Sequence, residues 1–174
     1  LGGAWIVIGL VCGIIACIGR PDDTTDVLLS GLERLEYRGY DSAGVAVANG
    51  ELAVRKREGE LDNLRAAVES NPVSGSFGIG HTRWSTHGPP TDANAHPHTD
   101  ATGRVAVVHN GIIENYQELR DELEADGYVF VSDTDTEVVP HLVASSLDAG
   151  YSPEESFRNA VSRLEGSYAL AAIV

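Results

Sequence analysis

The fold class rests on one stretch, Gly44-Val45-Ala46-Val47-Ala48-Asn49-Gly50-Glu51-Leu52-Ala53-Val54-Arg55. Two runs rich in valine and alanine flank the dipeptide Asn49-Gly50, and Asn-Gly between such runs is the strongest short signal for a hairpin turn. We therefore expect residues 44–48 and 51–55 to form neighbouring antiparallel strands.

The segments on either side of this hairpin alternate between helix and strand patterns. Capping residues, apolar positions at helical spacing and terminal glycines predict helices over residues 22–39, 61–70, 113–127, from 135 onward and 152–164. The last of these should open with a capping box at Ser152-Pro153-Glu154-Glu155. Apolar runs predict strands over residues 12–18, 77–81, 104–109, 128–131 and 167–174. In the first helix, the shared buried face should hold Val27, Leu28, Leu32 and Leu35. A hairpin with interspersed helices indicates an α+β fold in one domain.

The composition and net charge exclude some classes of function. The chain has 174 residues, 43% of them hydrophobic and 22% charged, and a formal net charge of −14. Such a chain is globular, and repulsion from phosphates argues against nucleic acid as a partner. A single lysine among twelve basic residues resembles the composition of proteins from salt-loving archaea. Two cysteines cannot build a disulfide framework, which fits a reducing cytoplasm.

The first nineteen residues carry no charge, and their length alone meets the ~20-residue requirement of a membrane span. Five glycines, the lack of a basic leader and the lack of a cleavage pattern argue against a span or a signal peptide. We expect residues 1–11 to be an apolar extension, either a propeptide or an artefact of gene calling. A buried strand should then begin at Cys12.

Residues His81-Thr82-Arg83-Trp84-Ser85-Thr86-His87-Gly88 concentrate polar side chains that a core would not hold. The stretch has neither strand nor helix periodicity, so we expect a loop leaving a short strand. Arg83 could bind a carboxylate through two guanidinium N–H groups, and Asp135 could bind an ammonium group. Together these two residues suit the head group of an amino acid. The plainer alternatives are a solvated loop and a helix N-cap role for Asp135.

Three further residues are candidates for chemistry. Cys12 is either a small buried hydrophobe or a nucleophile, whereas Cys17 is expected to belong to the core. Asn110-Gly111 directly follows a predicted strand, where a side-chain amide and a glycine N–H can both donate to a developing oxyanion. The plainer interpretation of Asn110-Gly111 is a tight turn.

Six motifs occur in the order typical of one family. The chain resembles the glutaminase domain of glutamine–fructose-6-phosphate aminotransferases in Cys12-Gly13-Ile14-Ile15, LEYRGYDSAG (residues 35–44), HTRWSTHG (81–88), NAHPH (94–98), VHNGIIEN (108–115) and DTDTEV (133–138). YRGYDSAG distinguishes this family from phosphoribosyl-pyrophosphate amidotransferases and asparagine synthetases. The resemblance implies an N-terminal-nucleophile hydrolase fold, a four-layer αββα sandwich with two antiparallel sheets. Residues 12–174 would then be a type-2 glutamine amidotransferase domain that lacks its last part.

The resemblance implies a role for each matching residue. Cys12 matches the nucleophile that attacks the side-chain amide of glutamine, and Asn110 with Gly111 matches the oxyanion hole. The substrate-binding matches are Arg83 at the α-carboxylate, Asp135 at the α-amine, Trp84, Thr86 and His87 in the loop that closes the pocket, and Arg38 in the signature segment. The implied reaction is thioester formation with release of ammonia, followed by hydrolysis to glutamate, without cofactor or metal.

The resemblance also implies partners beyond this chain. L-glutamine is the substrate of the domain, and the complete family enzyme, a homo-oligomer, passes ammonia to an isomerase domain that converts fructose 6-phosphate into glucosamine 6-phosphate. That second domain is absent here, so fructose 6-phosphate is a partner only through it.

The sequence departs from the family pattern at two places. Eleven residues precede Cys12, whereas the family nucleophile is the mature N-terminus and uses its own α-amine in proton transfer. A non-catalytic glutamine-binding module is therefore the alternative function. Ser85 replaces a common alanine, a change we expect to have no effect. A zinc hydrolase built from His81, His87, His96, His98 and His109 is a further alternative, but no helix-borne histidine pair supports it.

Overall fold

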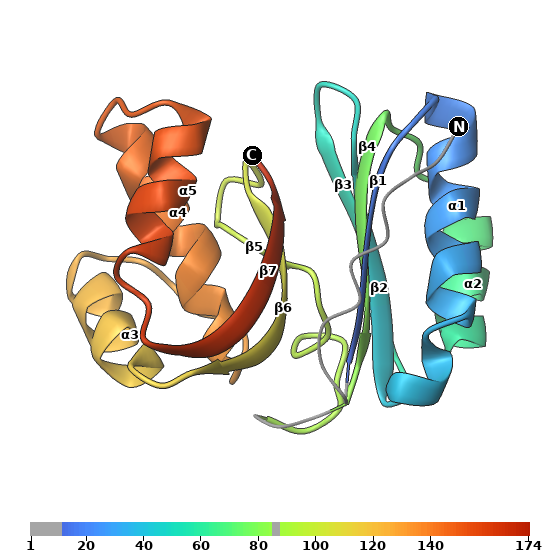
Figure 1. The fold of residues 1–174 in the computed structure, drawn as a ribbon, viewed down its shortest axis with the longest axis horizontal. Coiled ribbons are helices and arrows are strands. Elements are labelled where there is room, and N and C mark those ends of the chain that lie inside the picture. The colour runs from blue at the N-terminus through green and yellow to red at the C-terminus, as the bar shows by residue number, and fades with distance from the viewer. Residues whose placement is uncertain (1–11, 85–87) are drawn as a thin grey trace.

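The computed structural model describes residues 12–84 and 88–174, which form four layers in the order helix, sheet, sheet, helix (Figure 1). The first sheet and its helices are β1 (Gly13–Ile18), α1 (Pro21–Glu33), β2 (Ser42–Ala48), β3 (Leu52–Glu58), α2 (Leu61–Ser70) and β4 (Phe77–Arg83). The second sheet and its helices are β5 (His98–Thr99), β6 (Ala106–Ile113), α3 (Tyr116–Ala125), α4 (Val138–Asp148), α5 (Pro153–Val161) and β7 (Gly166–Ile173). The predicted α+β sandwich with antiparallel sheets is confirmed.

The first sheet has the strand order β1-β4-β2-β3, with every neighbouring pair antiparallel. The predicted hairpin joins β2 to β3, and Gly50 adopts a φ of +87° in its turn, a conformation that glycine takes at little cost. β1 is an edge strand whose side chains alternate between buried and exposed. The expectation of a fully buried first strand was therefore wrong, because β1 has a neighbouring strand on one side only, and Ile18 at its end is 82% exposed.

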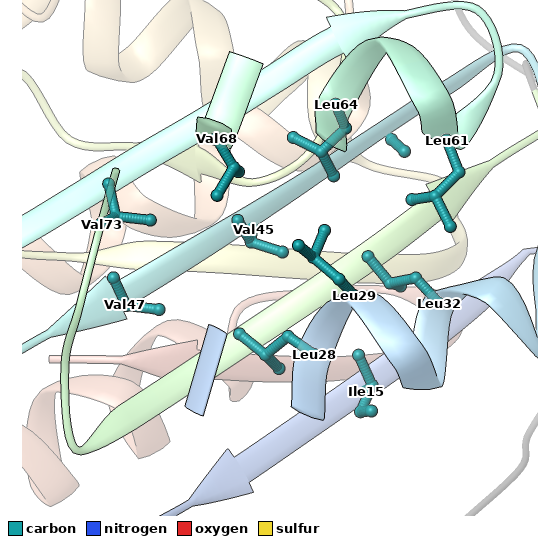
Figure 2. Close-up of a cluster of buried hydrophobic side chains, with 11 residues drawn as sticks. Ile15, Leu28, Leu29, Leu32, Val45, Val47, Leu61, Leu64, Val68 and Val73 are labelled. Carbon is teal, nitrogen blue, oxygen red and sulfur yellow. The ribbon is translucent and has the colours of Figure 1, made fainter. Parts of the chain in front are cut away.

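Helices α1 and α2 cover the outer face of this sheet with apolar side chains (Figure 2). α1 begins with Pro21 at its first position and places Asp22 and Asp23 in the first turn, where their charges complement the helix dipole. Leu28 and Leu32 are fully buried, and each such side chain contributes roughly 1.5–3 kcal/mol to the free energy of folding. Val27, predicted on the same face, is 41% exposed, and Leu29 takes its place in the core.

The second sheet has the order β5-β6-β7, again antiparallel, with helices α3, α4 and α5 on its outer face (Figure 1). α5 opens with the predicted capping box: Ser152 Oγ accepts a hydrogen bond from the Glu155 N–H, and Pro153 stands at the first helical position. Between the sheets, a small cluster built from Ala46, Ile79, Ala106 and Val108 packs one sheet on the other.

Several predicted boundaries were wrong. The first helix ends at Glu33 and is followed by a separate 3-10 turn, η1 (Glu36–Arg38), instead of continuing to Gly39. Residues 128–131 are not a strand, because Tyr128 and Phe130 pack against the second core without a pairing strand. The last strand, β7, is a half-buried edge strand instead of a buried one, and α5 stops at Val161. Ile113 lies at the end of β6 and not in the helix that follows.

No helix among the described residues is long and apolar enough to cross a membrane. Residues 1–11, predicted to be an apolar extension, lie outside the described part of the chain.

Candidate active site

Cys12 lies immediately before β1, at the place where this strand runs beside the end of β4. Its Sγ accepts a hydrogen bond from the backbone N–H of Trp84 at 3.2 Å and lies 3.6 Å from the Trp84 carbonyl oxygen. Cys12 and Trp84 are 72 residues apart in sequence, so the sheet alone brings them together. Both cysteines are free thiols, and Cys17 packs against the first core as predicted.

The surroundings of Cys12 hold its thiol in the protonated form. Burial raises the pKa of the Cys12 thiol, and the negative charge of Asp41 raises it further. The Trp84 N–H and the positive charge of Arg83 act in the opposite direction but do not outweigh burial. A reaction that uses the Cys12 thiolate therefore needs a proton acceptor nearby.

Asn110 and Gly111 lie inside β6, so the expectation that they follow a strand was wrong, and so was the plainer interpretation of a tight turn. The Asn110 Nδ2 donates to the Cys12 carbonyl oxygen at 3.0 Å, across 98 residues of sequence. Because an amide nitrogen carries two hydrogens, Asn110 can hold this bond and donate to an oxyanion at the same time. Gly111 has a φ of +125°, and an added Cβ would lie 2.1 Å from the Ser167 carbonyl oxygen.

Arg83 is the last residue of β4 and is only 3% exposed. Its guanidinium donates to the carbonyl oxygens of Gly88 and Pro89 at 3.3 and 3.4 Å. Burial lowers the Arg83 pKa, while Asp41, Cys12 and Asp135 raise it, so these groups lie within electrostatic reach of the guanidinium. The arginine therefore anchors the segment after position 87 in addition to any substrate role.

Asp135 opens η2 (Asp135–Glu137), the 3-10 turn before α4, and is 4% exposed. Thr134, and not Asp135, occupies the N-cap position of this turn. The Asp135 Oδ2 accepts the backbone N–H of Ile113 at 2.9 Å, which ties the turn to the end of β6. The plainer alternative, a helix cap, was therefore wrong, although the carboxylate does hold backbone.

Of the remaining predicted site residues, the structure describes the surroundings of Trp84 and the position of Arg38 in the chain. Trp84 is 47% exposed, and its ring meets Tyr40 edge to face at 5.5 Å. Arg38 ends η1, and the next residue, Gly39, packs so closely on Arg83 that an added Cβ would lie 2.6 Å from its carbonyl group. The signature segment is thus held against the end of β4. Thr86 and His87 lie outside the described residues.

Four of the histidines named for a possible zinc site form a buried cluster that reaches Cys12 through Asn110. His81 and His96 stack with ring centroids 4.3 Å apart, and the His96 ring lies 4.7 Å from that of His98. Thr136 Oγ1 bridges His96 Nε2 and His109 Nδ1 at 2.9 and 2.8 Å. These four imidazoles are at most 5% exposed, so the expectation that His81 to Arg83 belong to a loop outside the core was wrong.

Burial lowers the pKa of His81, His96 and His98 and keeps these three rings neutral near pH 7. The pKa of His81 falls to about 4, because burial outweighs its hydrogen bond with Asn110, and those of His96 and His98 fall well below the usual range. Within residues 12–84 and 88–174, no three His, Cys, Asp or Glu side chains meet in an arrangement that could hold a metal ion.

The sequence did not single out Asp41, whose charge acts on both Cys12 and Arg83. It belongs to the YRGYDSAG motif, and an acidic residue just before a buried strand was a signal that could have identified it.

The sequence matches known proteins along nearly its whole length. Residues 81–173 match the family described as "Glutamine amidotransferase domain". The chain is 58% identical over 164 residues to a glutamine–fructose-6-phosphate aminotransferase (isomerizing) of Symbiobacterium thermophilum and 50% identical over 167 residues to that of Sulfolobus acidocaldarius. Each match covers 94% of this chain but only 26% and 28% of the relative, so the chain spans about a quarter of their length.

Solved structures share the fold. A glutamine phosphoribosylpyrophosphate amidotransferase from B. subtilis superposes on 92% of this chain with a TM-score of 0.79 and 28% identity, covering 35% of that protein. A glutamine aminotransferase class-II domain protein from Silicibacter pomeroyi superposes on 91% of the chain and 71% of its own length, with a TM-score of 0.55 and 21% identity. The second likeness concerns the fold alone.

Proposed function

The chain belongs to the glutamine amidotransferase domain family, and from this premise we propose that it hydrolyses the side-chain amide of L-glutamine with Cys12 as the nucleophile. One observation carries the proposal: the Asn110 amide lies 3.0 Å from the Cys12 carbonyl oxygen although the residues are 98 apart in sequence. A thiol and a side-chain amide donor held together are the two groups that acyl transfer from an amide requires.

The proposed reaction has two stages. The Cys12 thiolate attacks the glutamine carboxamide carbon, and the oxyanion that forms accepts hydrogen bonds from the Asn110 Nδ2 and the Gly111 N–H. The carbon–nitrogen bond then breaks, ammonia leaves with the thiol's proton, and a thioester joins Cys12 to the glutamyl group. Water hydrolyses the thioester, which releases glutamate and restores the thiol.

Because the pKa of the Cys12 thiol is raised, a nearby group must accept its proton before the thiolate can attack. An α-amine has a pKa of about 8, close to the working pH, and would suit this role if Cys12 were the first residue. We propose that the active form begins at Cys12, after removal of residues 1–11. With Val11 attached, the nitrogen of Cys12 is an amide and cannot accept a proton.

Arg83 and Asp135 are proposed to hold the α-carboxylate and α-amine of glutamine. Trp84 is proposed to shape the pocket with Thr86 and His87, and Arg38 to act from the signature segment. Because Arg83 and Asp135 also bond to backbone, their replacement should affect both substrate binding and folding. Arg83→Lys keeps the positive charge but loses the paired N–H groups of the guanidinium, so it should raise KM for glutamine with a smaller fall in Tm than Arg83→Ala.

The complete enzyme is proposed to use the released ammonia for glucosamine 6-phosphate synthesis from fructose 6-phosphate, in a homo-oligomer of the cytoplasm. These steps need a second domain beyond residues 1–174.

The test compares glutamate release from residues 1–174 with release from residues 12–174. The shorter form should be at least ~100-fold faster, since general base assistance contributes about that much or more. Cys12→Ala should abolish hydrolysis in the shorter form, whereas Cys17→Ala, the matched control, should leave it intact. Glutamine binding without hydrolysis in both forms would instead support the non-catalytic binding module.

A further inference from the structure

His81 connects the histidine cluster to the Asn110 amide through one ring nitrogen. Its Nε2 lies 2.9 Å from the His109 carbonyl oxygen and 2.8 Å from the Asn110 Oδ1. On the other side of the same amide, the Asn110 Nδ2 donates to the Cys12 carbonyl oxygen. A single chain of hydrogen bonds therefore runs from the backbone of His109 to the backbone of Cys12.

The two backbone carbonyl groups at the ends of this chain of hydrogen bonds determine where each of its hydrogens lies. A carbonyl oxygen only accepts, so the His81 Nε2 must carry a hydrogen, which it shares between the His109 oxygen and the Asn110 Oδ1. The Cys12 carbonyl likewise requires the nitrogen end of the Asn110 amide. A flipped amide would place NH₂ against the Nε2–H and oxygen against oxygen at Cys12, so both bonds would be lost.

The environment of His81 keeps this arrangement in place. The side chain is 1% exposed and stacks on His96, which restricts rotation of its ring. Burial lowers the pKa of His81 to about 4, so the ring is neutral near pH 7 with one hydrogen, and that hydrogen is on Nε2. Nδ1 has no hydrogen-bond partner among the described residues, which leaves Nε2 as the functional end of the ring.

We propose that His81 is a positioning residue: its Nε2–H fixes the orientation of the Asn110 amide, so that the amide nitrogen faces the Cys12 nucleophile and can donate to the oxyanion. The inference rests on the proposed function, because only an amide hydrolysis gives the Asn110 donor its task. His81 itself does not touch the substrate in this scheme.

The kinetic test uses the form of the chain that hydrolyses glutamine in the experiment above. His81→Phe keeps a ring but removes the donor, and should lower kcat while the KM for glutamine changes little, since it leaves Arg83 and Asp135 in place. The loss should approach the ~100-fold or greater effect of removing an oxyanion donor. His81→Gln, which retains a side-chain N–H, should recover part of kcat. His141→Phe, the matched control at a 1% exposed histidine that lies against the Tyr128 and Phe130 rings, should keep full activity.

A double-mutant cycle separates positioning from general structural damage. In an Asn110→Ala background, His81→Phe should cause no further loss of kcat, because the amide that it orients is gone. Additive losses in the double variant, or full kcat in His81→Phe, would overturn the proposal.

A second measurement does not depend on activity or on a variant that folds. Nitrogen NMR of the full 174-residue chain with labelled histidine should show His81 protonated at Nε2 and bare at Nδ1 near pH 7. The opposite tautomer would refute the proposal even in an active protein. A chain that shows the expected tautomer but no glutamine hydrolysis would instead contradict the proposed function alone.

Discussion

Replacing Gly111 with alanine should destabilise the protein through two separate effects. Gly111 has a φ of +125°, which costs an L-residue about 1–2 kcal/mol. The new Cβ would also lie 2.1 Å from the Ser167 carbonyl oxygen and 2.7 Å from the Tyr168 Cα. Both contacts are backbone atoms of β7, the strand that pairs with Gly111, so no side-chain rotation relieves them. Such overpacking costs a further ~1–3 kcal/mol.

The expected loss for Gly111→Ala is therefore about 2–5 kcal/mol in the free energy of unfolding, a large share of the ~5–15 kcal/mol typical of a domain. Gly50→Ala is the matched control, since Gly50 also has a positive φ, +87°, but no heavy atom lies within 4 Å of its added Cβ. It should lose only the conformational part, about 1–2 kcal/mol.

Urea unfolding of both variants, followed by far-UV circular dichroism, measures the difference. With slopes of ~1–3 kcal/mol/M, Gly111→Ala should unfold at a midpoint roughly 1 M or more below the unchanged protein, and clearly below Gly50→Ala. Coincident unfolding curves for the two variants would show that β7 does not lie against Gly111, and the close backbone approach inferred here would be wrong.

Three further predictions concern the core, an acidic group and the nucleophile. Leu28→Ala should lower the free energy of unfolding, measured in urea, by about 2–5 kcal/mol, whereas Val27→Ala, at a neighbouring position that is 41% exposed, should change it by less than ~0.5 kcal/mol. Equal losses would show that Val27 is buried as the sequence predicted. Burial alone would raise the pKa of Glu137, but His141, 3.8 Å away, and hydrogen bonds from Ser132 and the backbone lower it to about 2. This stabilisation is present above pH 4.5 and is lost as the pH falls toward 2. Glu137→Gln should flatten that part of the stability profile, and an unchanged profile would contradict the assignment. Because burial raises the pKa of the Cys12 thiol, its alkylation by iodoacetamide, followed by mass spectrometry, should reach half its maximal rate at a higher pH than in a cysteine-containing reference peptide; a lower midpoint would mean that Arg83 and the Trp84 N–H dominate.

The hairpin at Asn49-Gly50, the capping box at Ser152 and the helix over residues 61–70 were all predicted from short segments and are confirmed. Each depends on interactions within a few residues: the φ that a turn needs, a side chain that caps its own helix, or an apolar face with helical spacing. The motifs that resemble the family could be recognised for the same reason, since they are contiguous in the chain.

The burial of the polar site was decided by tertiary structure. His81 and Arg83 looked like loop residues because polar side chains rarely enter a core, and the neighbouring sequence gives no partner for His81, His96 or the Cys12 thiol. Those partners come from elsewhere: Asn110 for His81, Thr136 for His96, and Trp84 for the Cys12 thiol. Burying a polar group costs less free energy when the group is hydrogen-bonded, and here the tertiary fold brings together segments many residues apart that supply these hydrogen bonds.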